Sequence, residues 1–173
     1  MIVAVEVDAT AARYRLYAVA STSANDARAA FFDDLVRCET RLYNAVGDRL
    51  SSEHGISTAQ YELLKHLARH PRARVADLAA AFAAGVGAVS KMVDRLEGRD
   101  LVRRVPNPDD RRSSLIDLTA GGTALVADAG RSFDARLREL LAVLDADEVD
   151  AVVGVLGTLR RSLEDGRVGI PVG

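Results

Sequence analysis

Basic and small polar side chains gather between residues 86 and 112, and they are of the types that contact nucleic acid. This segment holds seven basic and five acidic residues, so it is net +2 in a chain whose formal net charge is -2. Lysine and arginine bind phosphate, whereas a hydroxyl, an ammonium or a methyl group near a helix start can reach base edges. The pattern predicts a DNA-facing surface on an acidic body. The residues expected on this surface are Ala88, Val89, Ser90, Lys91, Arg95, Arg103, Asp110, Arg111 and Arg112.

Two short helices are expected to carry the first of these residues. Apolar residues recur at helical spacing over residues 75–82 and again over 86–96, and Gly85 and Gly87 interrupt the period between the two runs. Two helices joined by a glycine-containing turn form a helix-turn-helix, whose second helix can enter the major groove. The alternative is an ordinary solvated helix start. The residues expected to face the core are Val75, Leu78, Ala79, Phe82, Val86, Val89, Val93 and Leu96.

A charged hairpin is predicted after the second helix. Residues 101–105 (LVRRV) and 113–118 (SSLIDL) read as strands, and the second alternates polar with apolar side chains as a half-buried strand does. Residues 106–112 (PNPDDRR) between them cannot be helical at their prolines. Because successive strand residues point to opposite faces, only one of Arg103 and Arg104 can face DNA. The predicted fold is therefore mainly α, a winged helix-turn-helix with a small antiparallel β wing.

The segment LEGRDLVRRVPNPDDRRSSLIDLTAGG, residues 96–122, resembles the family of multiple-antibiotic-resistance regulators, the MarR family. Members show a helix ending in Leu-Glu, a Gly-Leu-Val/Ile-x-Arg strand, an Asp-x-Arg wing tip and a Leu-Thr-x-x-Gly helix opening. Residues 110–112 match the wing tip, and residues 118–122 match the helix opening. Asp100 stands where the family usually has glycine, and aspartate tolerates the left-handed conformation better than most residues. The resemblance covers roughly residues 26–165.

The resemblance implies roles for the wing and for the second helix. Arg112 matches the wing-tip arginine that enters the minor groove, and Asp110 would orient it through a charge-assisted bond. Arg111 is expected to meet phosphate, and a solvated charged loop is the alternative for the whole wing tip. Ser90 and Lys91 match the family in part, because serine or threonine followed by arginine is common there.

Four residues of the second helix and its C-terminal turn have open roles. Ala88 and Val89 are apolar and can touch thymine methyl groups. Arg95 and Arg99 either contact phosphate or form surface ion pairs, and nothing in the pattern favours one of these interpretations. The acidic partners considered for them are Asp94 and Glu97.

Longer helices are expected on both sides of this lobe, at residues 25–54, 120–144 and 145–164. Their apolar residues exceed what one outer face requires, so each helix must pack on something, and a symmetric dimer is the simplest solution. The MarR family closes its dimer with its first and last helices, which places two recognition helices ~34 Å apart on a near-palindromic operator. We assign residues 57–119 to DNA binding, and residues 25–54 and 120–165 to dimerisation. The expected helix caps are Ser57, Thr119 and Asp145.

Composition limits the remaining possibilities. The chain has 173 residues, of which 49% are hydrophobic, which suits one compact domain with a dimerisation arm. Residues 1–24 are expected to be an extension of uncertain structure rather than a signal peptide, and residues 166–173 a flexible tail. A single cysteine suits a reducing cytoplasm, and no apolar run approaches membrane-spanning length. No phosphate loop, paired Cys/His motif or catalytic grouping is recognisable, so we expect neither an enzyme nor a bound cofactor or metal.

For the cysteine and the histidines, a structural role is expected rather than a role in peroxide sensing or metal binding. Cys38 shares an apolar stripe with Leu35 and Leu42, so a buried thiol is expected rather than the peroxide sensor that some relatives carry nearer the helix start. His66 and His70 are four residues apart and form a conceivable metal pair, but no further Cys/His cluster supports it.

The sequence thus predicts a homodimeric DNA-binding repressor that a small phenolic or aromatic carboxylate ligand releases from a pseudo-palindromic operator. Arg37, Arg41 and Tyr61 are the candidates for a ligand pocket between the dimer helices and the DNA-binding lobe. One alternative is a regulator that ignores ligands, in which side chains fill that pocket. Another is a degenerate protein-interaction module, against which the intact Lys91, together with the wing arginines, argues.

Overall fold

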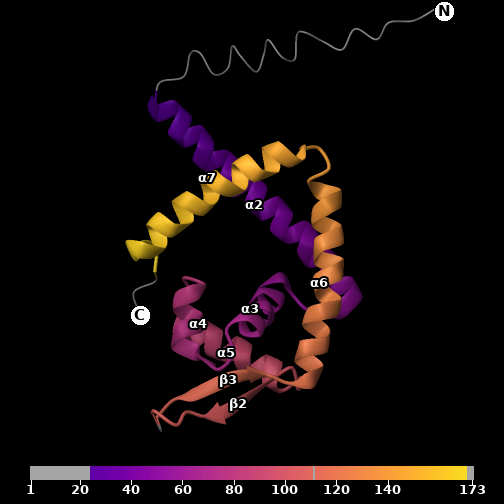
Figure 1. Cartoon of the computed structure of the whole chain (residues 1–173), viewed down its shortest axis with the longest axis vertical. Coiled ribbons are helices and arrows are strands. Elements are labelled where there is room, and N and C mark those ends of the chain that lie inside the picture. The colour runs from indigo at the N-terminus through magenta and orange to yellow at the C-terminus, as the bar shows by residue number, and fades with distance from the viewer. Residues whose placement is uncertain (1–23, 111, 171–173) are drawn as a thin grey trace, which may run out of the picture. The chain divides into compact units, whose positions relative to one another are not determined.

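The computed structural model describes residues 24–110 and 112–170, and it confirms the mainly α winged helix-turn-helix (Figure 1). Most of the extension predicted at residues 1–24, together with Arg111 and the last three residues, lies outside the described residues. The elements in chain order are α2 (Ala24–His54), α3 (Thr58–Arg69), β1 (Ala73–Arg74), α4 (Val75–Ala81), α5 (Val86–Glu97), β2 (Val102–Pro106), β3 (Ser114–Leu118), α6 (Ala120–Leu140) and α7 (Ala146–Asp165).

The chain divides into two compact units, the first ending at Arg41 and the second beginning at Leu42, so α2 contributes to both. In the first unit the described residues form the N-terminal part of α2, and Cys38 is exposed there. The prediction of a buried thiol is therefore wrong for the single chain. Helical spacing identifies an apolar stripe, but the stripe is buried only if another segment covers it.

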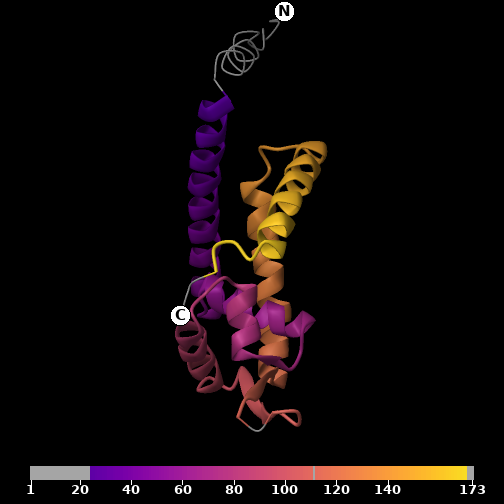
Figure 2. The same cartoon turned by 90° about the vertical axis from the view of Figure 1, so that its left-hand side faces the viewer.

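The core of the second unit forms where α3, α4 and α5 meet the sheet, and Figure 2 shows these helices gathered at the base of the β2–β3 hairpin. Four large side chains from these elements are fully buried there, and they are Leu64, Leu78, Leu96 and Ile116. The apolar faces of the helices and of β3 therefore pack into one common core. Two predicted core residues are exposed instead. They stand at helix ends, where little of the chain covers them, and they are Phe82 (37% exposed, after α4) and Val86 (55% exposed, at the start of α5).

The sheet has three antiparallel strands in the order β1-β3-β2, one more than the sequence predicted. β1 has only two residues, Ala73 and Arg74, too few for alternation to reveal. The hairpin register places Arg103 opposite Asp117 and Arg104 opposite Ile116. Arg103 and Arg104 therefore point to opposite faces, as predicted.

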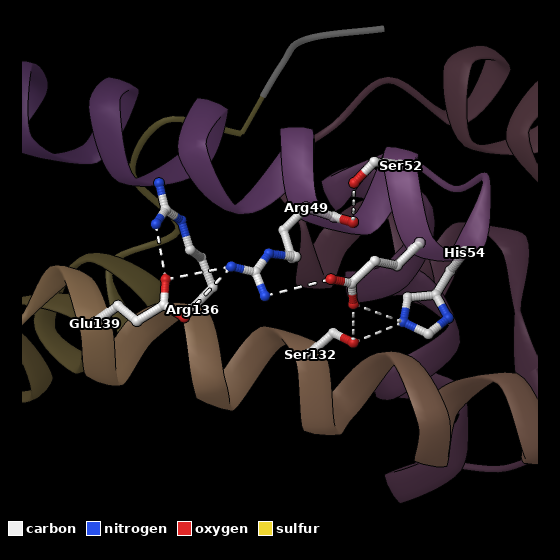
Figure 3. A network of polar contacts seen from close by, with 7 residues as sticks. Arg49, Ser52, His54, Ser132, Arg136 and Glu139 are labelled. Atoms are coloured by element: carbon white, nitrogen blue, oxygen red, sulfur yellow. Dashed lines mark hydrogen bonds and ion pairs between the residues drawn. The ribbon is translucent and has the colours of Figure 1, made fainter.

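A second core joins the C-terminal part of α2 to α3 and α6, and a polar network runs along the α2–α6 contact (Figure 3). Ser132 Oγ on α6 donates to a carboxylate oxygen of Glu53 at 2.5 Å and lies 2.8 Å from His54 Nε2. The guanidinium of Arg49 lies 3.3 Å from carboxylates of both Glu53 and Glu139. These pairs are partly exposed, so they fix how the helices meet more than they stabilise the fold.

The helix caps confirm three local predictions and correct one boundary. The side chains of Ser57, Thr119 and Asp145 accept hydrogen bonds from the backbone N–H groups of Gln60, Gly122 and Glu148. α6 ends at Leu140 rather than near residue 144. Asp145 has the extended backbone of a helix cap, so the chain must leave one helix before it can begin the next.

Among the described residues, no single helix is long and apolar enough to cross a membrane. The bent pair formed by α4 and α5 passes the same test by length and composition only.

Candidate nucleic-acid interface

The exposed face of α5 carries four of the nine residues predicted to contact DNA. Ala88, Lys91 and Arg95 are exposed, and Ser90 is half-buried beside them. Residues three and four apart share one face of a helix, so these side chains form one row. In the described structure, open space surrounds Gly87 in the first turn, which lets another surface approach the helix backbone closely.

Val89 does not belong to this face, which corrects its predicted contact with thymine. Its side chain is only 3% exposed and packs in the core with Val93 and Leu96. Positions 89, 93 and 96 follow the spacing of one helix face, and the start of that face is already buried. Of the two residues predicted to touch thymine, Ala88 is therefore the one that remains available to a methyl group.

Arg104 on β2 binds both carboxylates that α5 presents near its C-terminal end. Its Nη2 lies 2.6 Å from Asp94 Oδ1, its Nη1 binds Glu97, and its backbone N–H donates to Glu97 Oε1 at 3.0 Å. Burial lowers the pKa of Arg104, but the hydrogen bonds and charges of the two carboxylates together outweigh it and raise that pKa above its ordinary value. The guanidinium is therefore always charged, and it connects the recognition helix to the wing.

This contact bears on whether Arg95 and Arg99 contact phosphate or form surface ion pairs. The ion pairs considered for them do not form, because Arg104 occupies Asp94 and Glu97. Arg99 Nη1 instead donates to the carbonyl of Gly55 at 2.9 Å, which ties the turn after α5 to the turn after α2. Within the described part of the chain, Arg95 has no hydrogen bond or ion pair, so it is available to phosphate. No local sequence pattern predicts this role of Arg104, because its partners lie on another element.

Arg103 points away from α5 and into solvent. Its side chain is 63% exposed, and its guanidinium lies 3.6 Å from a carboxylate oxygen of Asp117 on the neighbouring strand. Exposed pairs of this kind are weak and readily exchanged for another anion. Of the two neighbouring arginines, Arg103 is thus the one free to reach a phosphate.

Backbone hydrogen bonds shape the tip of the wing. Asn107 is 8% exposed, its Nδ2 donates to Ser113 Oγ at 2.9 Å, and its Oδ1 accepts from the backbone N–H of Asp109. Asp110 Oδ1 accepts from the backbone N–H of Arg112 at 2.9 Å, rather than from the guanidinium as predicted. The tip is a series of side-chain-to-backbone turns that present an exposed Arg112.

No role was predicted for Asn107 in the wing tip, although asparagine between two prolines is a recognisable turn signal. The start of α6, which follows the wing, has the conformation that its sequence predicts. Asp100 has a left-handed backbone (φ 55°), and its carbonyl accepts from Thr119 Oγ1 at 2.6 Å. A Cβ at position 122 would collide with the carbonyl of Leu101, so only glycine allows α6 to begin this close to β2. The root of the wing is thereby fixed against α6.

The predicted ligand-pocket residues fall in different units. Arg37 and Arg41 are exposed in the first unit, whereas Tyr61 is buried in the second, 5.0 Å from Phe133 between ring centroids. Burial raises the pKa of Tyr61, as expected for a phenol in a core. The pocket stays a prediction.

The two histidines considered for metal binding stack on each other instead. The ring centroids of His66 and His70 are 4.6 Å apart, and those of His66 and Phe82 are 5.3 Å apart. Among the described residues, no group of three or more His, Cys, Asp or Glu side chains is placed to hold a metal ion.

Comparisons with known proteins agree with this geometry. The sequence model of the MarR family matches residues 56–114. The multiple antibiotic resistance protein MarR of Escherichia coli is 33% identical over 113 residues, which cover 62% of this chain and 78% of the relative. The transcriptional repressor NicR of Pseudomonas putida is 29% identical over 92 residues, 53% of this chain and 58% of the relative.

Solved structures of related regulators share the fold. The apo form of wild-type MarR from E. coli superposes with a TM-score of 0.65 at 27% identity, and the match covers 73% of this chain and 95% of that one. A structure of BpsR from Bordetella bronchiseptica, described as regulated in its DNA binding by 6-hydroxynicotinic acid, superposes with a TM-score of 0.66 at 25% identity. That match also covers 73% of this chain and 95% of the other.

Proposed function

The chain belongs to the MarR family of transcriptional regulators, and on that premise we propose that it is a homodimeric repressor that a small ligand releases from operator DNA. Two copies of α5 enter successive major grooves of a near-palindromic site. Ser90 and Lys91 read base edges there, with Ala88 beside them. Arg95, Arg103 and Arg111 meet phosphate, while Arg112, held by the turn at Asp110, enters the minor groove.

The observation that carries this proposal is the face of α5. Ala88, Lys91 and Arg95 form an exposed row, and the carboxylates of Asp94 and Glu97 nearest to it are occupied by Arg104. The wing that follows presents Arg112 on a hydrogen-bonded turn. A cationic helix face beside a shaped cationic hairpin fits the alternating grooves and phosphates of double-stranded DNA.

Repression and ligand release are supported by relatives rather than by the geometry. NicR is named as a repressor, and the BpsR structure is described as showing regulation of DNA binding by 6-hydroxynicotinic acid, an aromatic carboxylate. We therefore propose an effector of that chemical class or a phenol. A regulator that ignores ligands is the alternative, and it would keep its affinity at every effector concentration.

The test begins with selection of a duplex from a random library by the wild-type protein. An inverted repeat is the expected product. Lys91→Ala and Arg112→Ala should each weaken binding to the selected duplex, whereas Arg131→Ala, which removes an exposed arginine of α6, should not. Failure to enrich any duplex would refute DNA recognition. Titration with 6-hydroxynicotinate, salicylate and simple phenols then tests release.

A further inference from the structure

The recognition helix carries acidic side chains where a DNA-binding surface should have none. Asp94 lies one turn beyond Lys91 and Glu97 one turn further, and their side chains are 58% and 39% exposed. A free carboxylate near phosphate repels it. A structural role would explain why α5 carries these two carboxylates, and the residue that binds both of them indicates what that role is.

Arg104 meets both carboxylates from the wing. One nitrogen of its guanidinium binds Asp94 and the other binds Glu97, while its backbone N–H holds the second oxygen of Glu97. Its side chain is only 29% exposed. A guanidinium presents donors in a fixed fork, so two carboxylates on one helix face fix the helix both along and around its axis. A lysine would supply the same charge without the fork.

We propose that Arg104 is a positioning residue for operator recognition: its two-carboxylate contact with Asp94 and Glu97 holds α5 in one orientation relative to the wing. This inference rests on the proposed function. The consequence is that Ser90 and Lys91 on the helix and Arg112 on the wing engage neighbouring grooves of the same site at a fixed spacing. Losing the contact loosens discrimination between DNA sequences more than it weakens attraction to DNA in general.

Charge-preserving variants separate positioning from attraction. Non-specific affinity depends mainly on total charge, so Arg104→Lys should bind a scrambled duplex like the wild type and with the same salt dependence. Its preference for the selected duplex over the scrambled one should fall about tenfold, the size of a typical coupling between contacting residues. The matched control is Arg131→Lys, at an exposed arginine of α6 outside the proposed interface, which should keep the wild-type preference.

Asp94→Asn gives a test of sign. If Asp94 acted only through its charge, removing that charge would tighten binding to every duplex. If it orients the helix through Arg104, the preference for the selected duplex should instead fall. Arg104→Lys combined with Asp94→Asn should lose little more than either variant alone, because both break one contact.

Several results would overturn the inference. These are an unchanged preference in Arg104→Lys, equal tightening on both duplexes in Asp94→Asn, or additive losses in the double variant. Thermal unfolding monitors folding, and a loss of folded protein would lower both affinities equally without changing their ratio. If the wild type shows no preference for any duplex, the proposed function fails; if it shows a preference that Arg104→Lys retains, only this inference fails.

Discussion

Helices α5 and α7 both carry apolar residues at helical spacing, yet only α5 is covered by its own chain. Val93 and Leu96 of α5 are fully buried in the core of the DNA-binding lobe. Within the described part of the chain, no residue of α7 is buried, and Val153 and Val155 are 63% and 62% exposed. Helical periodicity therefore identifies an apolar face that must be covered, but it does not show whether the same chain or another molecule covers it.

The largest expected effect is on α7. Replacing Leu156 and Leu159 together with aspartate should abolish the proposed dimer, because it would place charges in an apolar interface. Operator binding should be lost with it, since one recognition helix alone covers half of a site. Sedimentation gives the oligomeric state, with Arg160→Asp on the exposed surface of α7 as the control. A wild-type protein that sediments as a folded, DNA-binding monomer would show that α7 does not need a partner subunit.

Replacing a leucine with alanine should have different consequences in α5 and in α7. Leu96→Ala in α5 should lower the free energy of unfolding by about 2–5 kcal/mol at any protein concentration, because it opens a cavity in a filled core. Leu163→Ala in α7, where leucine is exposed, should destabilise mainly through weaker association. Denaturant unfolding at several protein concentrations distinguishes the two. Equal losses that do not depend on concentration would contradict the assignment.

A residue of the lobe can also be exposed because its partner is DNA. Arg112→Ala should weaken binding by about 1–3 kcal/mol per half-site, and the loss should shrink where the flanking minor groove is wide. Ser90→Ala should instead change which bases are preferred, with little effect on the salt slope. Titrations across salt and across a small operator library measure both. Wild-type affinity of Arg112→Ala at every salt concentration would refute the role of the wing.

The contact between α3 and the end of α4 predicts a smaller effect of pH. Burial lowers the pKa of His66 below its ordinary 6.5, and the nearby His70 and Arg69 lower it further. The unfolded chain therefore binds this proton more readily, so stability is complete above about pH 6.5 and is lost as pH falls through the pKa of the folded state. Thermal unfolding across this range should show a smaller acid loss in His66→Asn than in the wild type. Identical pH profiles would contradict it.

No effect is expected at Cys38. Its thiol is exposed in the single chain, on a stripe that we propose the partner subunit covers. Cys38→Ser should keep the operator affinity and any ligand response of the wild type, before and after treatment with hydrogen peroxide. Peroxide that releases the wild type from DNA but not the variant would show that the cysteine is a sensor.

Features that depend on a few consecutive residues can be predicted from the amino-acid sequence alone. The caps at Ser57 and Asp145 and the left-handed turn at Asp100 were predictable, because each depends on hydrogen bonds or backbone conformation within about one helical turn. The strands beside the wing were predictable from alternation, although β2 begins and ends one residue later than expected.

The direction in which each side chain points, and the residue that it contacts, depend on how the helices and strands pack together. Val89 is core because the face that begins with it packs on the sheet, and a rotation of the helix would have exposed it without changing the sequence. Arg104 binds Asp94 and Glu97 from the strand that follows their helix, and Arg49 binds Glu139, which lies 90 residues further along the chain. Local sequence patterns cannot predict such pairs, because the two residues come together only when the core forms.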